Sequence, residues 1–68
     1  MNLIVNSETK KYSDDVTTVG KLLKVLNIKK PERVAVEINK EIIDQSAFKE
    51  TVIKSGDCIE IVSFVGGG

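Results

Sequence analysis

Apolar and polar residues alternate along several short segments of the chain, as they do in β-strands with one buried face. The clearest case is 34–38, where Val34, Val36 and Ile38 would share one face and Ala35 and Glu37 the other. Compact β-prone runs between turn-forming residues predict further strands. These lie at about 2–6, 9–12, 41–43 and 58–65, with turns at 6–7, 39–40 and 54–57.

One segment has the periodicity of a helix instead. Thr18 suits the N-cap, and the apolar residues after it recur at the i, i+3, i+4, i+7 spacing that places them on one helical face. These residues are Val19, Leu22, Leu23 and Leu26. Asn27 suits the C-terminal stop, and Pro31 prevents the helix from resuming.

The last predicted strand carries apolar residues on both faces. Ile59 and Ile61 would lie on one face, and Cys58, Glu60, Val62 and Phe64 on the other. Such a strand is either central in its sheet or leaves part of one face for a partner, and we favour a docking surface around Phe64 and Glu60. Cys58 is expected to be a small buried apolar residue.

The order of elements predicts the fold class. Two strands, one helix, two short strands, an irregular crossover at 44–50 anchored by Phe48 and a final strand follow one another. One helix covers only one side of such a sheet, so we expect an α+β domain with the other face partly open. A chain of 68 residues forms one domain, which we place at 1–65, followed by a flexible tail at 66–68.

Charge and cysteine content exclude several classes of partner. Ten basic and ten acidic residues alternate along the chain, whereas nucleic-acid binding needs a concentrated basic field. No apolar run approaches the ~20 residues that span a bilayer, so no membrane partner is expected. The single cysteine, Cys58, forms no internal disulfide and suits a reducing compartment, which we take to be the cytoplasm.

The residue inventory also argues against catalysis. The chain has no histidine, so it assembles no Cys/His pair, no Ser/His/Asp triad and no His or multi-Cys zinc site. Carboxylate-only chemistry remains formally possible, but so short a chain has little volume for a pocket around two acids. We therefore expect no catalytic residue, no metal ligand and a carrier instead of an enzyme.

The fold does not explain the terminal Gly66, Gly67 and Gly68, because glycine loses the most backbone entropy on ordering and has no side chain to pack. Directly after a strand, they predict a flexible extension that threads a narrow channel in a partner. The carboxylate of Gly68 is a poor electrophile, so a partner must first convert it to a mixed anhydride, for instance with AMP. The alternative is a passive end on a plain interaction module.

Several short motifs match one known family in order, spacing and terminus. They are MNLIVN (1–6), TTV (17–19) with LL (22–23), VAVEIN (34–39), GD (56–57) with IEIV (59–62), and FVGGG (64–68). With these motifs the whole chain resembles the ThiS family, the sulfur carriers of thiamin biosynthesis in the ubiquitin-like β-grasp group. The resemblance implies a mixed sheet of about four to five strands with one helix on one face.

The resemblance also implies a reaction cycle. An ATP-dependent adenylating (E1-like) enzyme would activate Gly68, so that ATP is consumed by the partner and no cofactor is bound by the chain. A sulfur donor, ultimately a cysteine desulfurase persulfide, would convert the adenylate to a thiocarboxylate, from which thiazole synthase takes the sulfur. Phe64, Val65, Gly66 and Gly67 would form the partner-binding tail.

Other acceptors remain open: a molybdopterin precursor, tRNA thiolation or protein conjugation. The small subunit of molybdopterin synthase shares the fold and the Gly-Gly end but usually has prolines just before it. The segment 63–65, Ser-Phe-Val, lacks them, which favours the thiazole pathway.

Overall fold

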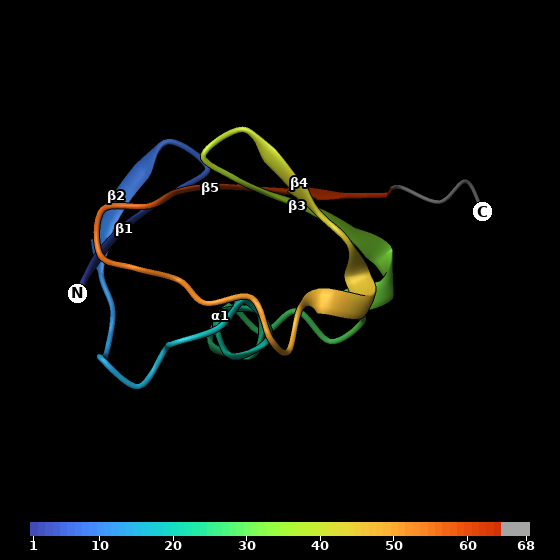
Figure 1. Cartoon of the computed structure of the whole chain (residues 1–68), viewed down its shortest axis with the longest axis horizontal. Coiled ribbons are helices and arrows are strands. Elements are labelled where there is room, and N and C mark those ends of the chain that lie inside the picture. The colour runs from blue at the N-terminus through green and yellow to red at the C-terminus, as the bar shows by residue number, and fades with distance from the viewer. Residues whose placement is uncertain (65–68) are drawn as a thin grey trace.

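A single mixed sheet with one helix on one side forms the domain (Figure 1). The computed structural model describes residues 1–64, so the predicted boundary at residue 65 and the tail at 66–68 lie outside the described residues. The sheet has the strand order β2-β1-β5-β3-β4. The elements are β1 (Asn2–Val5), β2 (Glu8–Lys11), α1 (Val19–Val25), β3 (Val34–Ile38), β4 (Glu41–Ile43) and β5 (Cys58–Ser63).

β5 occupies the middle of the sheet. It pairs in parallel with β1 and antiparallel with β3, and the two outer pairs, β1 with β2 and β3 with β4, are antiparallel hairpins. Figure 1 shows α1 on one side of these strands, with the crossover after β4 beside it. The predicted α+β architecture is confirmed. The two-faced pattern of the last strand predicted either a central strand or one with a partly open face, and β5 is central.

Both ends of α1 form as the sequence predicts. The Lys21 N–H donates to Thr18 Oγ1 at 3.3 Å, which satisfies one of the free donors of the first turn. Asn27 has φ of 61°, its N–H donates to Lys24 O, and the Ile28 N–H donates to Leu23 O at 2.9 Å. This is the paired bonding of a Schellman motif, and asparagine tolerates its left-handed conformation.

The core lies between α1 and the sheet and is almost entirely aliphatic. Its most deeply buried side chains, each less than 2% exposed, are Leu3, Val19, Leu22, Leu23, Val36 and Ile59. Phe48 closes the core from the crossover at 5% exposure, as predicted. The crossover also contains a 3-10 turn, Gln45–Ala47, where an irregular segment was expected. Another 3-10 turn, Pro31–Arg33, begins at the proline that was expected to prevent the helix from resuming.

Two asparagine side chains complete the hydrogen bonding of β5. Where β1 turns away, Asn6 Oδ1 accepts from the Ile61 N–H at 2.7 Å. Where β3 ends, Asn39 Oδ1 accepts from the Cys58 N–H at 3.0 Å. Both asparagines start hairpin turns with φ near 50°, a conformation that asparagine adopts more readily than most residues. Local turn chemistry therefore also holds the central strand.

No helix within residues 1–64 has the length and apolar character needed to cross a membrane.

The N-cap of α1 gives a first prediction. Thr18→Ala removes the acceptor for the Lys21 N–H and should lower the free energy of unfolding by about 1 kcal/mol in urea titration. Thr17→Ala is the matched control, because it removes only an exposed bond from Lys21 Nζ and should cost less than about 0.5 kcal/mol. Equal losses in the two variants would show that the cap contributes nothing.

The link from Asn6 to β5 gives a second prediction. Asn6→Asp keeps both the acceptor for the Ile61 N–H and the tolerance of positive φ, so its stability should stay within about 0.5 kcal/mol of the parent. Asn6→Gly loses only the acceptor and should cost about 1 kcal/mol, whereas Asn6→Ala also strains the turn and should cost about 2 to 3 kcal/mol. An alanine variant as stable as the aspartate variant would contradict this ordering.

Candidate functional site

The side of the sheet that α1 does not cover is the candidate site, and we call it the outer face. Strand register identifies its members, because residues paired across neighbouring strands point to the same side. The pairs are Ile4 with Cys58, Ala35 with Val62, Glu37 with Glu60, and Glu37 with Ile42. The alternate residues of the same strands, such as Val36 and Ile59, are buried under α1. The outer face is therefore a surface that the described part of the chain leaves open.

One end of the outer face is apolar. Ile42 and Val62 lie on the two strands that flank β3, and Ala35 on β3 pairs directly with Val62. Ile42 is 74% exposed and Val62 60% exposed, and Phe64, just past the end of β5, is 53% exposed. Large apolar side chains gathered on one surface of a small domain mark a contact site for another protein.

Two carboxylates lie next to this apolar end. Glu37 on β3 pairs directly with Glu60 on β5, and neither takes part in an ion pair within residues 1–64. Like charges in directly opposed positions of a sheet are destabilising. Lys40 lines the same hollow as the two carboxylates and offsets part of their repulsion, and a basic group supplied by a partner would relieve the rest. This end of the outer face is therefore complementary to a surface that is both apolar and positively charged.

The last described residue, Phe64, is held at a fixed point beside this surface. The Phe64 N–H donates to Arg33 O at 2.8 Å, which adds one bond to the β3–β5 ladder beyond the pair of Val34 with Ser63. Phe64 is thus held by the residue that precedes β3, while its side chain stays exposed. The other predicted tail residues, Val65, Gly66 and Gly67, and the predicted modified residue, Gly68, lie outside the described residues.

The prediction that Cys58 is buried is wrong. Its side chain is exposed and lies on the outer face, at the end away from Val62. The alternating pattern correctly grouped Cys58 with Glu60 and Val62, but it did not show that this whole face lacks a covering layer. Sequence reasoning also missed Ile4, Ala35 and Ile42, because only the register of the strands brings them onto the same surface as Val62.

Within residues 1–64, no group of three or more Cys, Asp and Glu side chains is arranged to hold a metal ion.

Comparisons with known proteins connect this architecture to one family. The model of the ThiS family matches residues 3–68. The sulfur carrier protein ThiS of Bacillus subtilis is 39% identical over 66 residues, which cover 97% of this chain and 98% of that protein. The crystal structure of a thiamine biosynthesis protein (ThiS) from Geobacter metallireducens is 38% identical, with a TM-score of 0.84 over the full length of both chains.

Some relatives are much longer. A thiazole synthase from Paramagnetospirillum magneticum is 40% identical over all 68 residues, yet the chain spans only 20% of its length. A thiazole synthase from Magnetococcus marinus is 45% identical over 38 residues, which are 12% of its length.

The match to the Geobacter metallireducens structure extends over the whole domain and confirms the predicted ubiquitin-like β-grasp fold. Because the family model also covers all but the first two residues, this chain belongs to the ThiS family.

Proposed function

We propose that this chain is a sulfur carrier, which bears sulfur as a thiocarboxylate on Gly68 and donates it to the thiazole of thiamin. The observation that carries the proposal is the match to the Bacillus subtilis sulfur carrier protein ThiS over nearly the full length of both chains. The proposal requires that Gly68 have a free carboxylate.

The proposed chemistry begins with activation by a partner. Attack of the Gly68 carboxylate on the α-phosphate of ATP forms an acyl adenylate and releases pyrophosphate. A persulfide from a cysteine desulfurase relay then displaces AMP, and a thiol cleaves the S–S bond of the acyl disulfide to leave the thiocarboxylate. The partners supply every catalytic group and the ATP, so the carrier itself needs no cofactor and is not an enzyme.

The outer face is the proposed docking surface for these partners. An adenylating enzyme and a thiazole synthase must both receive the same residue, Gly68, so both must approach the point where the chain leaves β5. Phe64 and Val62 would anchor the partner there, while Glu37 and Glu60 would attract its basic groups. Because both enzymes would use the same surface, the carrier would have to leave one enzyme before it binds the other.

The tail residues would lie within the partners. Val65, Gly66 and Gly67 would run along a channel too narrow for larger side chains, so that Gly68 reaches the reacting groups. The occurrence of a similar segment inside longer thiazole synthases supports thiazole synthase as the acceptor enzyme. We place the cycle in the cytoplasm, where thiols stay reduced.

Thiocarboxylate formation is the direct test of the proposal. The protein is first shown by intact mass to end at Gly68 and is then incubated with an adenylating enzyme, ATP and a persulfide donor. We expect the mass increase of one oxygen-to-sulfur exchange, located at Gly68 by fragmentation. A semisynthetic protein with an amidated Gly68 should show no exchange, because it offers no carboxylate.

A version without Gly68 still ends in two glycines. It tests whether the terminal carboxylate must extend to the position of Gly68 to react. It should unfold at the same temperature as the parent but exchange at least ~100-fold more slowly, because its carboxylate falls short of the reacting groups. It should also fail to rescue thiamin-requiring cells that lack their own carrier. Exchange at the parental rate in this version, or in the amidated protein, would refute the assignment.

Docking through the outer face predicts a separate effect of its exposed side chains. Phe64→Ala and Val62→Ala should each lower kcat/KM for thiocarboxylate formation by about tenfold or more, mainly through KM. Val52→Ala is the matched control: its side chain is 62% exposed but lies outside the outer face, so kcat/KM should not change. An equal loss in all three variants would mean that the outer face is not the docking surface.

A further inference from the structure

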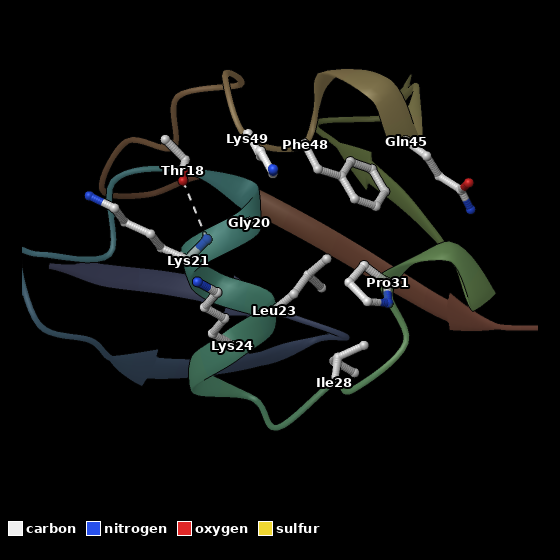
Figure 2. Close-up of a pocket in the computed structure, with 10 residues that line it drawn as sticks. All are labelled: Thr18, Gly20, Lys21, Leu23, Lys24, Ile28, Pro31, Gln45, Phe48 and Lys49. Atoms are coloured by element: carbon white, nitrogen blue, oxygen red, sulfur yellow. Dashed lines mark hydrogen bonds between the residues drawn. The ribbon is translucent and has the colours of Figure 1, made fainter.

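A hollow lies on the helical side of the domain, between α1 and the crossover that follows β4 (Figure 2). It has a volume of about 410 Å³. Four apolar side chains surround it: Leu23, Ile28, Pro31 and Phe48. We call this hollow the helical groove, and the proposed sulfur-carrier function makes no use of it.

The walls of the helical groove are held by hydrogen bonds. The Gly20 N–H donates to Phe48 O at 2.9 Å, which ties the first turn of α1 to the crossover. On the far side, Gln45 Nε2 donates to Glu32 O at 2.8 Å and joins the two 3-10 turns. Leu23 and Phe48 also belong to the buried core. The groove is therefore preformed, and a ligand would not have to open it.

The charged side chains of the helical groove all have one sign. Lys21, Lys24 and Lys49 line it, and no lining residue is acidic. Figure 2 shows Lys21 and Lys24 on α1 and Lys49 on the crossover, with the side chain of Lys21 extending away from the apolar hollow. Within residues 1–64, none of them forms an ion pair, and the only side-chain hydrogen bond among them is a 3.3 Å contact from Lys21 Nζ to Thr17 Oγ1. Lys21 and Lys24 are three residues apart on one helix and repel each other weakly.

The arrangement of charges favours an extended ligand over a compact one. The lysines come from two positions on α1 that are three residues apart and from the crossover, so the positive charges lie on more than one wall of the groove. A small molecule with one anionic group would neutralise only part of this positive charge. Successive acidic residues of a peptide reach several of the lysines while a neighbouring apolar side chain fills the hollow.

We propose that the helical groove binds an acidic segment of a partner protein. One large aliphatic or aromatic side chain of that segment packs against Ile28 and Pro31, over the buried Leu23 and Phe48, and its neighbouring carboxylates pair with Lys24 and Lys49. The helical groove and the outer face lie on opposite sides of the sheet. The partner in the groove therefore stays bound while a second enzyme acts on the tail.

The test begins with selection from a random-peptide display library on the immobilised protein. Sequences that combine one large apolar residue with two or more adjacent Asp or Glu residues should be enriched. A synthetic copy of the consensus should then shift the backbone amide resonances of α1 and residues 45–49 in ¹⁵N spectra, and leave those of β5 unchanged. Copies with the acids replaced by amides, or with the apolar residue replaced by glycine, should bind at least about tenfold more weakly.

Two double variants, each of which removes two positive charges, complete the test. Lys24→Gln with Lys49→Gln should weaken the consensus peptide by about tenfold or more, while Lys11→Gln with Lys40→Gln should leave its affinity within about twofold. Thermal unfolding of both variants verifies that the fold is intact. Enrichment of peptides without acidic residues, no enrichment, or binding that the two double variants weaken equally would overturn the proposal. So would saturation of the groove by octanoate at lower concentration than by the peptide, which would identify a small amphipathic anion as the ligand.

Discussion

The two-sided pairing of β5 is the constraint on which the rest of the structure depends. β5 bonds to β1 in parallel and to β3 in antiparallel register, and the side chains of Asn6 and Asn39 satisfy donors that those strands do not reach. One face of β5 carries Ile59 and is buried under α1. The opposite face would be buried only if another helix or sheet packed on it. With a single α-helix within residues 1–64, that part of the chain leaves the second face open, and Phe64 lies beside it.

This arrangement separates stability from function. The aliphatic residues that stabilise the domain point toward α1. The outer face carries exposed apolar side chains and the opposed Glu37 and Glu60, which lower the stability of the folded state. Because these exposed side chains do not stabilise the fold, binding of a partner protein is the better explanation for them. The helical groove is lined by lysines and lies on the other side of the sheet, so the two proposed docking surfaces would suit partners of different chemistry and would not compete.

Much of the fold was readable from the chain because its signals are local. The cap at Thr18, the helix stop at Asn27 and the period-two pattern of 34–38 each act within a few residues, and each appears as predicted. The exposure of Cys58 was missed because burial depends on which layers cover a face, and that is decided by distant parts of the chain. Membership of the outer face depends on register for the same reason: Ile42 joins Val62 there only through β3.

The central claim is that the adenylating enzyme binds this domain through the outer face of the sheet and not through its helical side. Methyl cross-saturation of the isotope-labelled carrier bound to an adenylating enzyme measures the interface directly, because only methyl groups close to the enzyme lose intensity. The account predicts loss at Ala35, Ile42 and Val62 on the outer face and none at Val25 and Val52, which are also exposed. Loss at Val25 and Val52 with none on the outer face would contradict it.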